Sequence, residues 1–303
     1  MKINFTIVFL IISLISAGTA NAQSSAVQNA LKDVQGQVQD LVTAKDEGQT
    51  DDLSLRIETF KKVVDFSISE AKDMKIKLLA LDKLSKEVAL WRDSIVSSLN
   101  KAIDYYEDQK ESLDDTNKIN LETIKKIASD FKEWRDKNYI AASSEADSYL
   151  LILQEQKAVE TAMKRSERIR KDVLALLKAK IKGAAQLQEL LGDADKKINE
   201  AADLNKEAND FFWNQYILPI ALRNIENETT TTSSVPAATS TLMNAPLFAT
   251  STATSSTSTD ANATSSPIFR TSSIKDLVES SLSQIKGAYQ IFIEMSNLVR
   301  KLL

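Results

Sequence analysis

Residues 53–106 read LSLRIETFKKVVDFSISEAKDMKIKLLALDKLSKEVALWRDSIVSSLNKAIDYY and contain neither glycine nor proline. Apolar side chains recur along this stretch at steps of three and four residues, the spacing of one face of an α-helix. The pattern predicts one uninterrupted helix, on the order of 80 Å long at a rise of 1.5 Å per residue. Only a coiled coil or a slender bundle buries an apolar stripe of that length. The stripe consists of Leu53, Ile57, Phe60, Val64, Ala71, Met74, Leu78, Leu81, Leu84, Val88, Trp91, Ile95, Leu99, Ala102 and Tyr106.

The rest of residues 23–228 has the same character. It holds a single proline, Pro219, and few glycines, whereas a sheet protein needs frequent turns. Lys, Glu, Asp, Ala, Leu and Ile dominate, as in long helices. We therefore predict an all-α protein whose residues 23–228 form an elongated helical bundle or coiled coil with long antiparallel helices.

Capping and breaking residues predict where the helices begin and end. The acids Asp114–Asp115 are interpreted in the same way, as turn and cap residues. In the first half of the chain, Gly48 ends a first helix (about 25–47), Asp51 or Asp52 starts the second, and Asn120 starts a third (121–137). A kink or hairpin is predicted at 136–147, and Ser143 or Ser144 starts a fourth helix. Further along, a bend is predicted at Gly183, a stop and new start at Gly192–Asp193, and a kink at Pro219 near the end of a fifth helix (194–227).

The N-terminus, MKINFTIVFLIISLISAGTANAQSS, has the three parts of a cleaved secretory signal. One cation, Lys2, precedes an apolar run over residues 3–15, and the small residues Ala20-Asn21-Ala22 follow it. The run is short for a membrane span. We expect residues 1–22 to be removed on export, with an uncleaved N-terminal anchor as the alternative. A lipid anchor on an N-terminal cysteine is excluded because the chain has no cysteine.

Export and composition together indicate a compartment and exclude one class of partner. Secreted proteins often carry disulfides, so a cysteine-free exported chain suggests a bacterial protein of the periplasm, the cell surface or the extracellular space. Without residues 1–22 the chain has 37 basic and 42 acidic residues, a net charge of −5. Nucleic acid requires a clustered basic surface, and this balance argues against it.

The chain also lacks histidine, which removes most catalytic and metal-binding chemistry. Ser-His-Asp and Cys-His nucleophiles, ordinary zinc, haem and iron–sulfur sites, and the Glu-x-x-His di-iron pattern are impossible. The segment DADKKINEAADL (193–204) begins like a calcium loop but has Ile198 in place of the sixth-position glycine and Leu204 in place of the last acid. We therefore expect no enzyme activity, cofactor or metal. A hydrolase that uses carboxylates alone is the least favoured alternative.

Composition changes sharply at residue 229. Residues 229–272 are rich in Ser and Thr, hold three of the four prolines and carry only two charges, so they are expected to form a disordered linker. The sequons at Asn227 and Asn262 matter only in a host that glycosylates.

Residues 273–303 predict a final amphipathic helix that Ser273 caps. Its apolar seam has to be covered, either by its own bundle, by a second copy, or by a membrane or other partner. We favour the same chain or a second copy over a membrane, because charged residues interrupt any spanning run. The seam consists of Val278, Ile285, Ala288, Phe292, Met295, Val299 and Leu302.

The tripeptide Trp-Arg-Asp occurs twice, starting at Trp91 and at Trp134. Neither Arg92 nor Arg135 has an acid three or four residues away, so each is expected to reach a carboxylate on a neighbouring helix. We interpret both copies as a tryptophan core layer beside an interhelical arginine. A ligand site used twice is the alternative.

Residues 211–222, which include Phe212 and Trp213, are apolar on nearly every face and contain Pro219. They are too short to span a bilayer. They are expected to form the buried end of the bundle, with a membrane-inserting tip as the alternative.

The segments DFKEWRDKNYIAA (130–142) and LQEQKAVETAMKRSERI (153–169) resemble uncharacterised, signal-bearing, all-helical exported proteins of uncultured bacteria. The resemblance covers about residues 120–225 and implies an exported helical protein without an assigned role. It carries over no catalytic residue.

Together these features favour an exported, non-enzymatic structural or interaction protein of the cell envelope, acting through helix–helix contacts. Its partner is expected to be a protein or a second copy, engaged through the C-terminal helix. A membrane-active helical protein, pore-forming or lipid-binding, is the alternative.

Overall fold

The computed structural model describes residues 24–46, 53–114, 119–223 and 273–302. These residues form helices and turns without a strand, which confirms the all-α class. The signal segment, Gly48, the caps at Asp51 and Asp52, Asp115, the Ser/Thr-rich linker and both sequons lie outside the described residues. The elements are α2 (Ser25–Asp46), α3 (Leu53–Leu79), α4 (Lys86–Ser112), α5 (Leu121–Asn138), α6 (Ile140–Lys178), α7 (Ala184–Phe212), a π-helix (Trp213–Ile217) and α9 (Ile274–Leu302).

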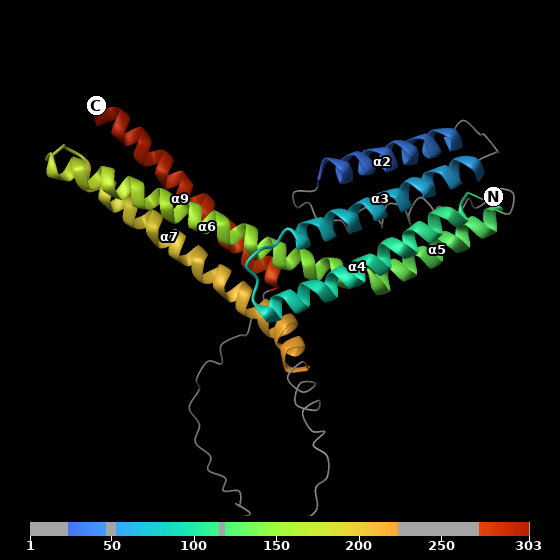
Figure 1. Ribbon diagram of the computed structural model, residues 1–303. Helices are drawn as coiled ribbons and strands as arrows, with labels where there is room; N and C mark the ends of the chain where they lie inside the picture. Colours follow the sequence, from blue (N-terminus) through green and yellow to red (C-terminus); the bar gives the residue numbers. More distant parts are fainter. Residues whose placement is uncertain (1–23, 47–52, 115–118, 224–272, 303) are drawn as a thin grey trace, which may run out of the picture.

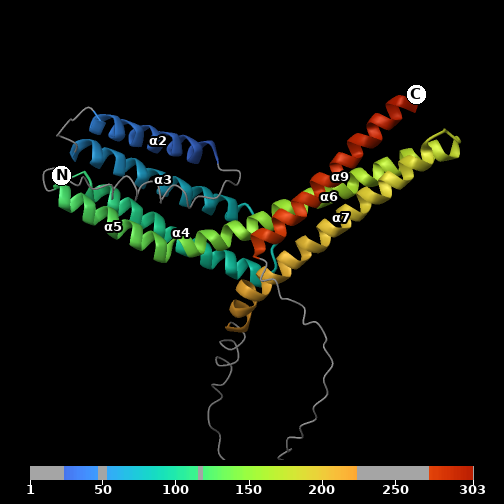
Figure 2. The same ribbon diagram turned by 180° about the vertical axis from the view of Figure 1, so that it is seen from behind.

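The helices form two arms that meet at an angle (Figure 1). Helices α2, α3, α4 and α5 make the first arm, and α7, α9 and most of α6 make the second. The same division is visible from behind (Figure 2). Each arm has its own apolar core, and the core of the first arm continues through the junction to Phe212 and Val278. Helices α6, α7 and α9 each contribute buried residues to both cores and so join them.

The predicted single helix over residues 53–106 is wrong, because the chain reverses between α3 and α4. Lys83 has a left-handed backbone (φ 54°), and Ser85 caps α4 by accepting a 3.3 Å hydrogen bond from the Val88 amide. Leu81 and Leu84 still pack on the core from within the turn, so the apolar spacing continues although the helix does not. The turn contains neither glycine nor proline, the residues that most often mark a turn in a sequence.

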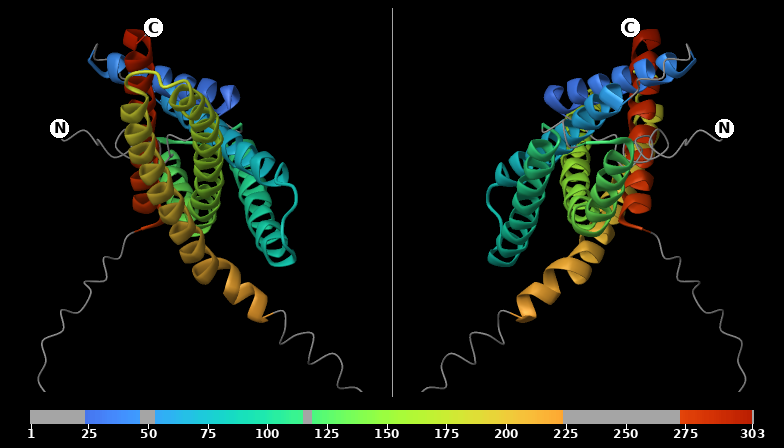
Figure 3. Two further views of the ribbon diagram at one scale, coloured as in Figure 1. Left: turned by 90° about the vertical axis from the view of Figure 1, so that its left-hand side faces the viewer. Right: turned by 90° about the vertical axis from the view of Figure 1, so that its right-hand side faces the viewer.

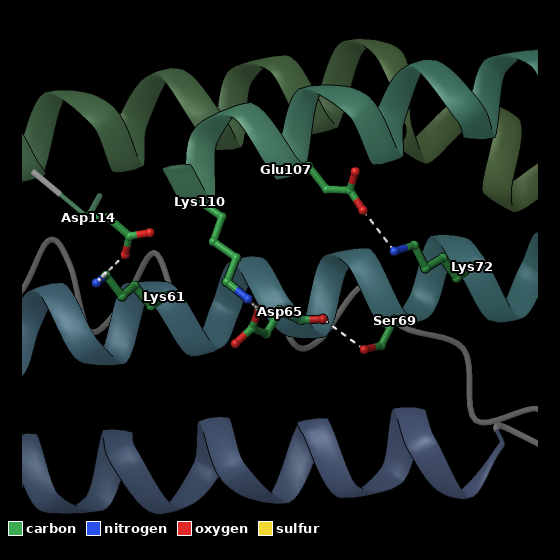
Figure 4. Close-up of polar contacts among 7 residues, drawn as sticks. All are labelled: Lys61, Asp65, Ser69, Lys72, Glu107, Lys110 and Asp114. Atoms are coloured by element: carbon green, nitrogen blue, oxygen red, sulfur yellow. Dashed lines mark hydrogen bonds and ion pairs between the residues drawn. The ribbon is translucent and has the colours of Figure 1, made fainter. Parts of the chain in front are cut away.

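The reversal places α3 and α4 side by side, and a ladder of ion pairs joins them (Figure 4). The ammonium nitrogens of Lys61 and Lys110 lie 2.7 Å from Asp114 and Asp65, and that of Lys72 lies 2.8 Å from Glu107. Asp114, interpreted from the sequence as a turn or cap residue, therefore also pairs across the hairpin. Pairs this exposed contribute little stability each, and their order along the two helices matches an antiparallel arrangement.

Helix α5 begins as predicted, since the Asn120 side chain accepts hydrogen bonds from the amides of Glu122 and Thr123. The chain then kinks at Tyr139 and does not form a hairpin: helical hydrogen bonds continue through Tyr139 into α6. The predicted restart at Ser143 is wrong, because this side chain is buried inside the first turn of α6, and its hydroxyl bonds the carbonyl of Ile140.

Two further predictions about glycines are corrected in the second arm. Gly183 (φ 88°) does not bend a helix but closes the reverse turn between α6 and α7. Gly192 does not end a helix, because it lies within α7 and that helix begins ten residues before Ala194, at Ala184. The buried seam of α7 passes this glycine without interruption, at alternating steps of four and three residues: Leu187, Leu191, Ala194, Ile198, Ala201, Asn205, Ala208 and Phe212.

Helix α9 begins as predicted. The Ser273 hydroxyl accepts from the Asp276 amide, and the Asp276 carboxylate accepts from the Ser273 amide. The helix then lies along α7 and α6 of the same chain, with the predicted seam residues from Val278 to Met295 buried and Val299 half-buried. The seam of α9 is therefore covered by the chain's own bundle, which is one of the alternatives predicted from the sequence.

Candidate functional site

The first Trp-Arg-Asp copy lies where the two arms meet. Trp91 of α4 is fully buried, and its ring packs edge-on against Tyr149 of α6 at 4.9 Å and Phe212 of α7 at 5.2 Å between centroids. Aromatic pairs in this geometry add stability beyond the area that they bury. These three rings, which come from three helices, therefore fix the end of α7 against both α4 and α6.

Trp91 also holds a carboxylate at the junction. Its indole Nε1 donates a hydrogen bond to Oε1 of Glu145, which is half-buried near the start of α6. Burial raises the pKa of Glu145, and the hydrogen bond from Trp91 opposes that shift. Sequence reasoning missed Glu145, because its partner is 54 residues away along the chain.

A groove of about 400 Å³ opens beside this pair. One wall is α4 and the start of α6, and the other is the π-helix with the helical residues that follow it. Its polar groups include a carboxylate, a guanidinium and two amides, which suit hydrogen bonding to a peptide or a polar ligand. The lining is Trp91, Ser94, Ile95, Ser98, Asn138, Ala141, Ala142, Glu145, Gln215, Tyr216, Pro219, Ile220 and Arg223.

The π-helix that forms the second wall has a local cause. Pro219 has no amide hydrogen, so it cannot continue the regular hydrogen-bond ladder. The amide of Leu218 bonds the carbonyl of Trp213, five residues back. Such single-turn π segments are often found at functional sites. The predicted kink near Pro219 therefore takes the form of a widened turn that faces the groove.

Neither predicted role for residues 211–222 describes this segment fully. Phe212 and Ile217 are buried and Trp213 is partly buried, as expected for the end of a bundle. Phe211, Leu218 and Leu222 are 45%, 39% and 53% exposed. The segment extends past the junction of the two arms (Figure 3).

The second Trp-Arg-Asp copy lies inside the first arm, away from this groove. Trp134 is half-buried and stacks on Tyr105 at 3.9 Å, and Arg135 is 1% exposed. The guanidinium of Arg135 pairs with Glu70 of α3 at 2.6 Å and donates to the hydroxyl of Tyr106 at 3.3 Å. The prediction of an interhelical acid is thus confirmed for Arg135.

The same prediction is wrong for Arg92, whose guanidinium lies 2.8 Å from its neighbour Asp93. Arg92 is half-buried and pairs with an exposed acid of its own helix, whereas Arg135 is enclosed by α3 and α4. The two copies therefore share a sequence and a buried tryptophan face, but they share no ligand site.

The predicted interaction residues of α9 belong to the core of the second arm. Ile285 and Phe292 are buried, and the guanidinium of Arg165 lies 5.9 Å from the Phe292 ring. Sequence reasoning missed the polar contact of this core, in which the Ser281 hydroxyl meets Glu155 of α6 and the carbonyl of Ala201. A signal for it was present, because Glu155 occupies a core position of α6 between Ile152 and Val159.

Within the described residues, no group of three or more acidic side chains lies close enough together to hold a metal ion. No protein-family model, curated protein or solved structure matches the chain.

Proposed function

We propose that the chain is an exported, non-enzymatic protein of the cell envelope that binds another protein at the junction of its two arms. The observation that supports this function best is the segment 211–223, whose buried residues fix it to the bundle while Phe211, Leu218 and Leu222 remain exposed beside a polar groove. Apolar side chains flanked by polar groups are typical of protein-binding surfaces.

The internal chemistry fits a scaffold better than a catalyst. The polar groups of Trp91, Arg135 and Glu155 are held in contacts between helices. The signal-like N-terminus motivates the export part of the proposal, and the acidic, evenly charged composition motivates a protein partner in place of nucleic acid.

The test introduces negative charge on the exposed apolar face. The double variant Leu218→Glu and Leu222→Glu is compared with Ile76→Glu and Leu79→Glu, which alters two exposed apolar residues of α3. Photocrosslinking from position 211 in the envelope fraction of the native host should give one discrete protein adduct. The adduct should disappear with the first variant and persist with the second. Equal labelling by both variants would contradict the proposed surface.

A membrane-active protein is the second candidate, and the same exposed residues support it. No helix in the described part of the chain is both long and apolar enough to cross a membrane. The distinguishing measurement is release of a trapped dye from phospholipid vesicles. Release that depends on Leu218 and Leu222 would favour membrane activity over protein binding.

A further inference from the structure

The far end of the second arm carries an unusual concentration of positive charge. The α6–α7 turn and the C-terminal end of α9 lie together there in every view (Figures 1, 2 and 3). Residues 173–188 and 295–302 contain no acid, although the whole chain has a net charge of −4. The end contains five exposed cations, here called the basic tip: Lys178, Lys180, Lys182, Arg300 and Lys301.

Local structure explains only part of the basic tip. Cations in the last turns of α6 and α9 complement the helix dipoles, which accounts for Lys178, Arg300 and Lys301. Lys182 lies just before the positive N-terminal end of α7, where a cation is unfavourable. Among the described residues, none of the five has an ion-pair partner.

The backbone of the turn is also unexpected. The amides of Lys180 and Ile181 bond the carbonyls of Leu177 and Leu176, which is the hydrogen-bond pattern of a Schellman motif. Lys180 occupies the left-handed position (φ 53°) that such a motif usually gives to glycine. The chain thus keeps a lysine side chain at a position where glycine is less strained.

An apolar groove of about 570 Å³ lies in the same arm, and part of its lining is close in sequence to the basic tip. It lies between α6 and α9, and its walls include Val173, Leu176, Phe292, Met295 and Val299. Leu176 is two residues before Lys178 in the chain, and Val299 is next to Arg300. Arg165 and Asp172 are charged groups on its lining.

An apolar groove with unpaired cations near its lining residues matches an amphiphile with a negative head group. We propose that the end of the second arm binds an anionic phospholipid, with an acyl chain in the groove and the head group at the basic tip. An acidic polypeptide would satisfy the cations but would leave the groove unfilled, and a neutral lipid would leave the cations unused. This site lies at the other end of α7 from the segment proposed to bind protein.

The first test compares binding of the full chain to vesicles of phosphatidylcholine alone and of phosphatidylcholine mixed with phosphatidylglycerol. We expect cosedimentation with the mixed vesicles only. Each cation near an anionic surface strengthens binding about fivefold, so replacing all five basic-tip residues with Gln should abolish cosedimentation. The matched control replaces Lys32, Lys72, Lys101, Lys126 and Lys137 of the first arm with Gln and should bind like the native chain.

Two variants test whether the groove and the turn contribute to binding beyond the effect of net charge. Ala175→Trp places a large ring at the groove, where Ala175 is exposed, and should weaken binding without changing the net charge. Lys180→Gly should raise the melting temperature while lowering binding about fivefold. Lys83→Gly is its control, because Lys83 is also exposed and left-handed (φ 54°) but lies in the α3–α4 turn; it should raise the melting temperature and leave binding unchanged.

The outcomes are decisive. Failure of the native chain to bind mixed vesicles, or undiminished binding by the five-Gln variant, overturns the site. Binding to polyglutamate but not to vesicles assigns the basic tip to an acidic polypeptide and also overturns the proposal. Undiminished binding by Ala175→Trp would show that the acyl chain does not occupy the groove, and the proposed mode of binding would then be incorrect.

Discussion

Two arginines in identical tripeptides differ because of what surrounds them. Arg135 is enclosed between helices and satisfied by Glu70, whereas Arg92 pairs with its own neighbour at the surface. Burial by itself lowers the pKa of Arg135, but Glu70, Tyr106 and Tyr139 together more than offset this effect and raise it, so the guanidinium stays ionised. A buried charge needs its partner far more than an exposed one does.

This difference predicts unequal effects of removing the two acids. Glu70→Ala should lower the free energy of unfolding by about 3–5 kcal/mol, because it leaves the Arg135 charge buried and unpaired. Asp93→Ala should change it by less than about 1 kcal/mol, because the Asp93 carboxylate is exposed to water. Urea unfolding followed by circular dichroism measures both. Similar small effects would mean that water reaches Arg135.

The number of hydrogens available for hydrogen bonding indicates the protonation state of the Glu155 carboxyl group. The Ser281 hydroxyl has one hydrogen but contacts two acceptors, Glu155 Oε1 and the Ala201 carbonyl at 2.8 Å. Both contacts are satisfied if Glu155 is protonated and donates to Ser281, which then donates to Ala201. Burial raises the pKa of Glu155, in opposition to its hydrogen bonds with Ser281 and Asn205, so the direction of the shift agrees with this assignment.

The assignment predicts a pH-dependent stability. Because the pKa of Glu155 is raised in the folded state, its contribution is complete below the unfolded pKa and is lost as pH rises through the folded pKa. Glu155→Gln keeps the shape without the titration. It should therefore be more stable than the native chain at neutral pH, and this advantage should vanish below about pH 4, near the unfolded pKa of a glutamate. Unfolding in urea at several pH values measures the difference, and a less stable Gln variant at pH 7 would show that the folded chain favours the carboxylate.

At the scale of the element, a strong local signal competed with a longer pattern. Gly192 was interpreted as a helix end, but the seam of α7 continues past it and holds the helix together. A Cβ built on Gly192 meets no atom within 4 Å, and the same is true of Gly36 in α2. Packing along the whole seam therefore outweighs the cost of one glycine.

Gly192→Ala should accordingly stabilise the protein by up to about 1 kcal/mol, because alanine loses less backbone entropy in a helix interior. Gly36→Ala should do the same in the first arm. Thermal unfolding measures both changes. A destabilising Gly192→Ala would indicate that the helix ends there in solution.

Neighbouring residues of α9 test whether that helix packs on its own chain. Phe292 is 4% exposed and Ile293 is 61% exposed. Phe292→Ala should cost about 3–5 kcal/mol in the unfolding of the second arm, and Ile293→Ala should stay within about 0.5 kcal/mol. Sedimentation at several concentrations distinguishes packing within one chain from packing between copies. Equal, small effects from both variants would mean that α9 does not pack on α6 and α7.

At the scale of the whole molecule, the arms are expected to remain apart. The chain has no native cysteine, so paired spin labels can be introduced without interference. Labels at Glu111 and Lys178, near the two arm ends, should give a long distance with a narrow distribution. Labels at Lys178 and Arg300, both in the basic tip, should give a short one. A short distance for the first pair would mean that the arms close on each other.

The sequence by itself determined the helical class, the cap at Asn120, the start of α9 and most of its buried face, because these depend on local hydrogen bonds and on a periodic apolar pattern. It also identified the residues that pack at the junction, Trp91 and Phe212, as core residues. Local patterns of this kind can be recognised in one segment without knowledge of the others.

Only the tertiary structure decided where the chain reverses and which residues meet. The turn at Lys83 uses a residue that does not mark turns, and its apolar neighbours keep the helical spacing. Glu145 with Trp91, Glu70 with Arg135, and the α6–α7 turn with the end of α9 are far apart in sequence, so their pairing depends on how helices pack. The apolar pattern specifies that a face is buried, but the shapes and charges of the other helices decide what covers it.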